Sequence, residues 1–410
     1  MTAGTPLRIR VLASSPVTWP GSPTPAELAD LLSWRRPPPP AMVGRTCWIP
    51  LAEGALKIKG VGLTSRSSAG LRITPPDPVN QFFRTFVHVG FDANGDWRLV
   101  DSGPAPMGGC RVSRAMSEYD AAVRLRRKGV PAVLPVGAWE YPDLHFAPTD
   151  ENLGVAVTLS PHASPWRCDI LLRPPDDGPP GRRRVYDKLV REATPSERLA
   201  SLALEFGARL RGLHEVGLHR YSGGPANWGY DPERDDTYLV DLDSCRPLEQ
   251  SAEPARALEC LRDLASCAFN MAAHAMGNRA TFRWRPEELA AGEPFHSLYQ
   301  GYFPECAPNE IARAVRPFAA YYTDLYLRHV ETDASIWMDR RVGYVALIMG
   351  ALPLYTRVAA GSGELPAPLP VDMVWRAAEP FLGAVGRRRI EGLPGIAETH
   401  IASSALTMKR

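Results

Sequence analysis

The sequence predicts an α+β protein with a strand-rich N-terminal half and a helical C-terminal half. Short apolar runs bounded by turn residues prevail before residue 160, and apolar residues recur at helical spacing after residue 194. A chain of 410 residues has room for more than one structural unit. We therefore expect two lobes with a boundary near residue 160.

The composition excludes several classes of protein. Lys and Arg (47) nearly balance Asp and Glu (45), so no broad basic surface for nucleic acid or membrane is expected. The seven cysteines form no Cys-x-x-Cys pair, which indicates reduced thiols rather than a zinc site or a disulfide framework. The N-terminus lacks the apolar core of a signal peptide, and the apolar run 342–355 is shorter than the ~20 residues that span a bilayer. These features predict a cytoplasmic protein.

The first elements are an arm and a lobe rich in hairpins. Residues 1–41 form the expected arm, which ends in the prolines 37–40 and is therefore not helical at that point. Residues 42–160 form the expected N-lobe. It starts with a hairpin, 47–51 and 55–59, followed by a loop of small residues, 60–70. A second hairpin, 86–91 and 97–100, turns at Asn94-Gly95, which tolerates the positive φ values such turns need.

One helix interrupts the strands of the N-lobe. Residues 113–128 carry an apolar face, a basic last turn, and a stop at Gly129 and Pro131. Strands are expected at 132–136 and 154–159. The proline- and arginine-rich run 173–184 then predicts a solvated loop.

Residues 161–360 form the expected helical C-lobe. The run Thr194-Pro195-Ser196-Glu197 is a capping box with proline at the first helical position, and an apolar stripe follows it to Leu213. Further helices are expected at 255–276, 307–332 and 342–358. Residues 361–410 are predicted to be a linker followed by a helical extension with a helix at 371–385.

The segment 213–245 contains a candidate metal site. A long helix leads into a loop with Asn227, and a short apolar strand then ends at Asp241. An amide oxygen and a carboxylate at the two ends of a small hairpin suit Mg²⁺ that bridges ATP phosphates. The alternative is a surface turn beside an exposed acidic strand end.

A candidate phosphate site lies earlier in the chain. Lys57 and Lys59 share one face of a strand, and Glu118 lies in the middle of the following helix. A strand lysine held by a helix glutamate is how kinases hold nucleotide phosphates. The alternative is that all three are solvated.

Over residues 43–330 the chain resembles the protein-kinase-like superfamily. Its motifs are most similar to those of the selenoprotein O family of atypical kinases, which transfer AMP. Residues 56–66, LKIKGVGLTSR, match that family's Leu-x-Leu-Lys-Gly-x-Gly strand and the Thr, Ser and Arg after it. Residues 111–118 resemble its Arg-Ser-Ser-x-x-Glu helix start.

The resemblance implies a two-lobed kinase-like fold that uses ATP and Mg²⁺ as cofactors. It makes Lys59 the phosphate lysine, whereas the ordinary kinase pattern Ala-x-Lys selects Lys57. If one lysine alone meets Glu118, its replacement weakens nucleotide binding more than that of the other. The magnesium ligands are Asn227 and Asp241. The remaining candidates for phosphate contact are Gly60, Gly62, Arg66, Arg111 and Arg114, since glycine allows close approach and arginine binds phosphate bidentately.

The chain departs from both patterns at the general base. Ordinary kinases place an Asp five residues before the Asn, where this chain has Ser222, and the triplet His219-Arg220-Tyr221 replaces His-Arg-Asp. The selenoprotein O family has an acid just before its Asn, where this chain has Ala226. Asp243 or His219 is then the substitute base, or the acceptor arrives deprotonated.

These observations predict an ATP- and Mg²⁺-dependent transferase that moves an adenylyl or phosphoryl group to a protein, peptide or small molecule. One alternative is a small-molecule kinase of the aminoglycoside-phosphotransferase type, with an acceptor pocket lined by Tyr299, Tyr302, Tyr321, Tyr322 and Trp337. Another is a catalytically inactive pseudokinase that binds a nucleotide or peptide.

Overall fold

The computed structural model describes residues 6–15, 20–39, 44–67, 70–83, 87–92, 94–160, 166–168, 182–192, 195–221, 223–275, 293–329 and 336–397. The chain divides into two compact units. The sheet unit contains residues 1–87, 101–166 and 228–245, and the helical unit contains 88–100, 167–227 and 246–410. The predicted α+β class is confirmed, but the division is not a single boundary near residue 160.

The sheet unit is built on an antiparallel sheet with the strand order β1-β11-β12-β3-β2. Strand β10 (Cys110–Arg111) pairs with β12 beside this path. The bounds are β1 (Arg10–Ser14), β2 (Thr46–Leu51), β3 (Gly54–Lys59), β11 (Leu134–Phe146) and β12 (Glu151–Ser160).

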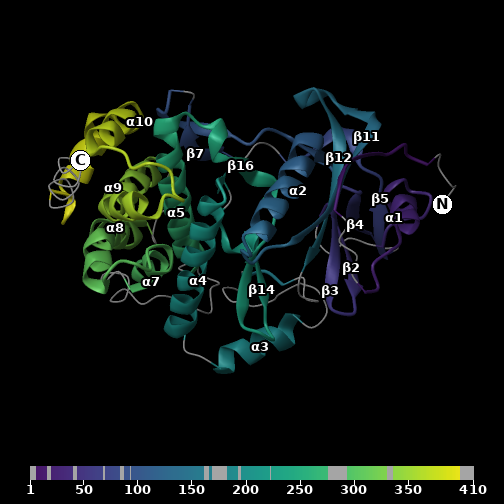
Figure 1. Cartoon of the computed structure of the whole chain (residues 1–410), viewed down its shortest axis with the longest axis horizontal. Helices are drawn as coiled ribbons and strands as arrows, with labels where there is room; N and C mark the ends of the chain where they lie inside the picture. The colour runs from purple at the N-terminus through teal and green to yellow at the C-terminus, as the bar shows by residue number, and fades with distance from the viewer. Residues whose placement is uncertain are drawn as a thin grey trace. The chain divides into compact units, whose positions relative to one another are not determined.

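The two faces of this sheet have different partners. On one face, Leu56 and Ile58 of β3 join an apolar core with Leu28 and Leu32 of helix α1 (Pro25–Leu32). Helix α2 (Val112–Arg127) packs against β11 and β12, as Figure 1 shows. The α2 contact is close because small side chains, including Ala115, meet there.

Strand alternation decides where the two lysines of β3 lie. Because Leu56 and Ile58 point into the apolar core, Lys57 and Lys59 point to the opposite face, where α2 lies. Both lysines are buried. A shift of one residue in the pairing of β3 with β12 would place both lysines in the apolar core.

Three segments differ from the sequence-based expectations. The described part of 1–41 is not an arm: β1 pairs with β11, and a capping box between Thr24 and Glu27 starts α1. Residues 60–70 are not a loop, because β4 (Leu63–Ser67) and β5 (Gly70–Thr74) form a hairpin. Residue 182, expected in a solvated loop, begins helix α3 (Arg182–Glu192).

The segment 228–245 returns the chain to the sheet unit. Strands β14 (Trp228–Asp231) and β15 (Asp236–Leu239) form a hairpin, and backbone hydrogen bonds join Leu239 to Pro131 and Val133. A short 3-10 turn, η4 (Leu242–Ser244), follows and packs against α2. Residues 241–243 are therefore placed near α2.

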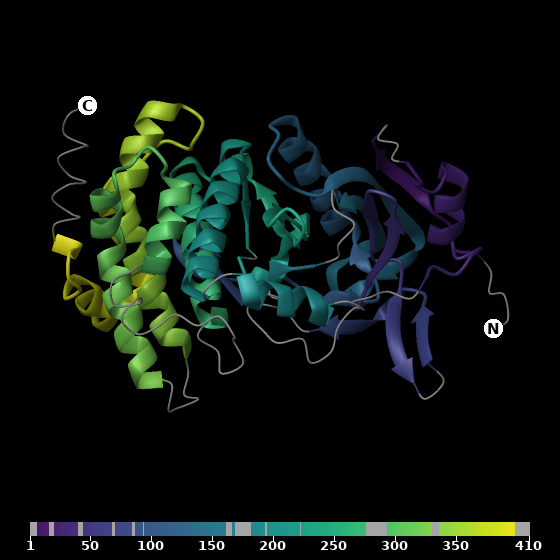
Figure 2. The ribbon, with the colours of Figure 1, turned by 90° about the horizontal axis from the view of Figure 1, so that it is seen from below.

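The helical unit contains the predicted helices. They are α4 (Pro195–Glu215), α5 (Glu253–Ala275), α8 (Pro308–His329), α9 (Ile336–Ser362) and α10 (Val371–Glu391), together with the unpredicted α7 (Glu293–Tyr302). Helix α4 packs on α7, and α9 packs on α5, α8 and α10 (Figure 2). Thr194 of the predicted capping box lies outside the described residues.

Helix α9 contains the longest apolar stretch. Its segment Arg341–Ser362 is long and apolar enough to cross a membrane. However, 89% of the most apolar stretch of that segment is buried inside the protein. Such burial is typical of a core helix. It is longer than the apolar run that the sequence alone suggested.

The predicted hairpin at Asn94-Gly95 is confirmed, and it packs in the helical unit. Its strands are β7 (Val87–Phe91) and β8 (Trp97–Asp101). The Trp97 ring lies 5.6 Å from the Phe381 ring of α10. Gly90 lies against Tyr221, since a Cβ atom there would be 3.1 Å from that ring.

Gly60, directly after β3, offers a test of this packing. A Cβ atom at Gly60 would lie 2.6 Å from the Gly154 carbonyl oxygen, and its φ is +96°. Gly70 has a similar φ of +101°, but a Cβ atom built at Gly70 would have no other atom within 4 Å. Gly70 is therefore a matched control for backbone strain alone. We expect Gly70→Ala to cost about 1 kcal/mol of unfolding free energy and Gly60→Ala at least ~2 kcal/mol more, measured by urea denaturation. Equal costs would show that the contact with β12 is not tight.

Candidate functional site

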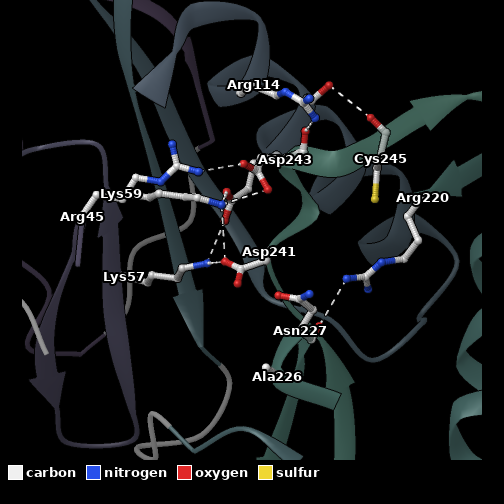
Figure 3. Close-up of polar contacts among 12 residues, drawn as sticks. Arg45, Lys57, Lys59, Arg114, Arg220, Ala226, Asn227, Asp241, Asp243 and Cys245 are labelled. Carbon is white, nitrogen blue, oxygen red and sulfur yellow. Dashed lines mark hydrogen bonds and ion pairs between the residues drawn. The ribbon is translucent and has the colours of Figure 1, made fainter. Parts of the chain in front are cut away.

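Four charged side chains meet on the α2 face of the sheet. The Lys57 Nζ atom lies 3.1 Å from the Glu118 carboxylate and 2.6 Å from the Asp241 carboxylate. The Lys59 Nζ atom lies 3.2 Å from the other oxygen of Glu118 and 3.4 Å from Asp241. Figure 3 shows both lysines directed at Asp241. The sequence-based choice between the lysines assumed that one of them alone meets Glu118. This assumption is wrong, because both lysines contact Glu118.

A further carboxylate, Asp243, extends this cluster. Its Oδ1 atom lies 2.9 Å from Lys59 Nζ, and its Oδ2 atom lies 3.3 Å from Arg45 Nη2 (Figure 3). The Arg114 guanidinium donates to the Asp243 carbonyl oxygen at 3.0 Å. We call Arg45, Lys57, Lys59, Glu118, Asp241 and Asp243 the lysine cluster.

The backbone of the 241–245 segment determines where its carboxylates point. Asp241 has a φ of 51° and a ψ of 53°, a left-handed conformation that Asp tolerates better than most residues. The 3-10 turn η4 then brings Asp243 back toward α2. Ser117 of α2 donates to the Cys245 carbonyl oxygen at 3.2 Å. Two α2 side chains, Arg114 and Ser117, thus hold this turn.

The electrostatics of the cluster favour the charged forms. Burial opposes the charge on Lys59, but Asp241, Asp243 and Glu118 outweigh it and raise the pKa of the Lys59 ammonium. Burial likewise opposes the charge on Asp243, but Lys59 and Arg45 lower the pKa of that carboxyl. Asp241 is the most exposed of the three carboxylates, at 24% against 15% for Asp243 and 0% for Glu118. A cation that approaches the cluster therefore reaches Asp241 most easily.

The predicted phosphate loop is not open. A Cβ atom at Gly60 would meet Gly154 and Cys110, and one at Gly62 would lie 2.2 Å from the Thr74 carbonyl oxygen. These glycines serve close packing between strands, so the structure does not support a phosphate-binding role for either.

Two of the predicted arginines share an acceptor. Arg111 and Arg114 both donate to the Ser102 carbonyl oxygen, at 2.9 and 2.8 Å. Arg114 also contacts Asp243, as described above, and Arg111 lies 3.6 Å from Glu151. The side chain of Arg66 lies outside the described residues.

Asn227, the second predicted magnesium ligand, belongs to the helical unit. It ends the 3-10 turn η3 (Pro225–Asn227), and its carbonyl oxygen accepts from Arg220 Nη2 at 3.3 Å. Asp241 belongs to the sheet unit. Their joint use as metal ligands is therefore a proposal. Ser222 lies outside the described residues.

A buried ionic network holds the segment before Asn227. The Asp263 carboxylate of α5 accepts from the backbone N–H of Arg220 at 2.6 Å and lies 3.2 Å from His214 Nε2. Arg262 donates to the Arg220 carbonyl oxygen at 2.6 Å and lies 3.0 Å from His219 Nδ1. In strand β13 (Leu218–Arg220), the backbone N–H and carbonyl groups of Arg220 are thus both held by side chains of α5.

Neither substitute base suggested by the sequence suits that role. Burial, and then Arg262, lower the pKa of His219 to about 3, so His219 binds protons weakly at neutral pH. Asp243 has a lowered pKa and cations at both oxygens. Tyr221 is not an alternative, because burial raises its pKa to about 12. None of these three groups is therefore suited to act as a general base at neutral pH.

Three of the five aromatic residues proposed to line an acceptor pocket are core residues. Tyr299, Tyr302 and Tyr321 are buried, and the Tyr302 hydroxyl lies 2.6 Å from His214 Nδ1. The side chains of Tyr322 and Trp337 lie outside the described residues. The structure therefore gives no support to that pocket.

Sequence reasoning missed Arg45 and the network on α5. Nothing in the residues around Arg45 distinguishes it, because its partner Asp243 lies 198 positions later. The α5 network did have a signal. Glu259, Arg262 and Asp263 interrupt an otherwise apolar stretch of helix, and buried charges require partners.

Comparison with known proteins gives similar solved structures at low sequence identity. The chain matches no protein-family model and no curated protein. Among solved structures it is similar to WaaP in complex with acyl carrier protein, at 14% identity and a TM-score of 0.34 over 60% of this chain and 90% of that one. It is also similar to a Toxoplasma gondii specific rhoptry antigen kinase domain (11% identity, TM-score 0.24, 85% of this chain and 87% of that one). A rhoptry kinase from Toxoplasma gondii matches at 12% identity and a TM-score of 0.24, over 88% of this chain and 87% of that one.

These TM-scores are too low to carry an argument about fold or activity. The kinase-like, two-lobed fold class rests on the molecule itself. It has an antiparallel sheet with one helix on its lysine face, a helix glutamate on the strand lysines, and a separate helical unit.

The buried His219 predicts a pH dependence of stability. In the unfolded chain its pKa is about 6.5, whereas in the folded protein it is about 3. As the pH falls below 6.5, the unfolded state binds a proton that the folded state refuses, so the free energy of unfolding decreases by up to ~1.4 kcal/mol per pH unit. We expect His219→Gln to reduce this slope between pH 6.5 and 4 in urea titrations. An unchanged slope would show that His219 is protonated in the folded protein.

Proposed function

We propose that the protein is an ATP- and divalent-cation-dependent transferase of kinase-like fold, which moves an adenylyl or phosphoryl group to a protein, peptide or small-molecule acceptor. The observation that carries the proposal is the lysine cluster, in which two buried strand lysines share a helix glutamate and an aspartate. A structural ion pair needs one lysine, and a second doubles the desolvation cost. Phosphate binding is a reason to retain both.

The residues present fit a magnesium ion. Mg²⁺ in nucleotide sites is usually bound by one or two protein oxygen ligands together with phosphates and waters. Asp241 offers a part-exposed carboxylate, and Asn227 offers an amide oxygen. Among the described residues no cluster of three or more His, Cys, Asp or Glu is arranged to hold a metal. When bound, the ion would neutralise phosphate charge.

The unsuitability of His219, Asp243 and Tyr221 as bases favours transfer to a nucleophile that needs little activation. Phosphoryl transfer has a loose transition state, so positioning and charge neutralisation supply most of the catalysis. The resemblance of residues 56–66 to the selenoprotein O family favours adenylyl transfer. The same unsuitability of these three groups keeps the nucleotide-binding pseudokinase as the second candidate.

Nucleotide binding can be tested directly at Asp241. We expect wild-type protein to be stabilised against thermal unfolding by ATP with Mg²⁺, and Asp241→Ala to lose at least ~90% of that shift, because the metal ligand is removed. The control is Glu53→Gln, an exposed carboxylate in the turn between β2 and β3. Wild-type protein that shows no shift would refute the proposed function.

Labelled ATP distinguishes the reactions. We expect label from the α position of ATP to appear on an acceptor, detected by autoradiography and mass spectrometry of the product. Transfer of label from the γ position would make the protein a kinase. Binding without transfer of either label would identify a pseudokinase.

A further inference from the structure

Three carboxylates surround the ammonium group of Lys59. In the structure the Lys59 Nζ atom contacts the carboxylates of Glu118, Asp241 and Asp243, at 3.2, 3.4 and 2.9 Å. A phosphate that approaches Lys59 competes with these carboxylates for the ammonium charge, so the release of one of them favours phosphate binding.

The structure indicates which carboxylate leaves. Glu118 is fully buried and pairs with both lysines. If it moved, both buried ammonium groups would lose a counter-ion. Asp243 is held by Arg45 at its second oxygen and by Arg114 at its carbonyl oxygen. Asp241 has the longest contact with Lys59 and the largest exposure.

Asp241 also neutralises the second lysine. Its Oδ1 atom lies 2.6 Å from Lys57 Nζ, the shortest ion pair of the cluster. The three positive side chains of the lysine cluster face its three negative ones, and Arg114 adds one positive charge beside Asp243. Asp241 offsets one positive charge of the site and so weakens its attraction for a polyphosphate, while an aspartate paired with two lysines attracts a metal ion poorly.

We propose that Asp241 is an exchangeable counter-ion, which leaves both lysines when it binds a divalent cation and so makes them available to phosphate. The ligand of this site is therefore a metal–polyphosphate complex, and neither half binds well without the other. This inference rests on the proposed function and adds to it a role for the second lysine, since Lys59 and Lys57 are released by one event. Lys59 keeps Asp243 as its partner throughout.

The first test removes the charge of Asp241 without a metal present. We expect Asp241→Asn to bind inorganic tripolyphosphate in EDTA about tenfold or more tightly than wild-type protein, measured by isothermal titration calorimetry. The amide keeps the size of the side chain but no longer competes as an anion. Glu53→Gln, which lies outside the cluster, is expected to match wild type. Equal or weaker binding by Asp241→Asn overturns the proposal.

The second test removes a lysine without a polyphosphate present. We expect Lys59→Met to bind Mn²⁺ alone more tightly than wild type, by about tenfold in electron paramagnetic resonance titrations, because Asp241 loses one counter-ion. Lys57→Met is a second variant with the same expectation, and the exposed Lys128→Met is the control. If neither lysine variant binds Mn²⁺ more tightly, the proposal is overturned.

The outcome for the proposed function is separate. Wild-type protein is titrated with AMP-PNP in Mg²⁺ and in EDTA. Binding of equal strength in both conditions contradicts the exchange at Asp241 and leaves the proposed nucleotide site standing. Failure to bind in either condition refutes the nucleotide site itself.

Discussion

The sheet unit depends on the burial of two lysine ammonium groups against one glutamate. Moving an ion out of water costs several kcal/mol, so Lys57 and Lys59 are tolerated because Glu118, Asp241 and Asp243 surround them. Each partner comes from a different part of the chain, namely α2 for Glu118 and the segment after β15 for the aspartates. The register of β3, the close approach of α2 and the left-handed backbone at Asp241 are all needed to complete this arrangement.

The sequence predicted the local structure well where the pattern was strong. The helix at 113–128, the hairpin at Asn94-Gly95 and the helices of the second half were found close to their predicted positions. Each of these has a signal within a few residues: a stop at Gly129, a turn that needs positive φ, or an apolar stripe. The capping box at Thr24 and Glu27 has the same kind of local signal, and it was overlooked inside a segment judged by its prolines.

The sequence identified most residues of the candidate site but did not show which of them contact one another. Lys57, Lys59, Glu118, Asp241 and Asp243 were all identified, and the structure brings them together in the sheet unit. That both lysines reach one glutamate depends on how far α2 lies from β3, which no local pattern encodes. Gly60 and Gly62 were interpreted as phosphate contacts because glycine permits close approach, yet it is the neighbouring strands that approach them.

The division of the chain has a consequence for how the protein is made. The chain passes between the two units five times, at 87/88, 100/101, 166/167, 227/228 and 245/246. During synthesis β3 and α2 leave the ribosome long before residues 241–243, so Glu118 is for that time the one carboxylate of the cluster available to both lysines. Helices α3 and α4 of the helical unit precede residues 241–243 in the chain, so both are translated before the sheet unit is complete. Neither unit corresponds to a contiguous gene fragment, and a truncation before residue 241 would leave the lysines without two of their three carboxylates.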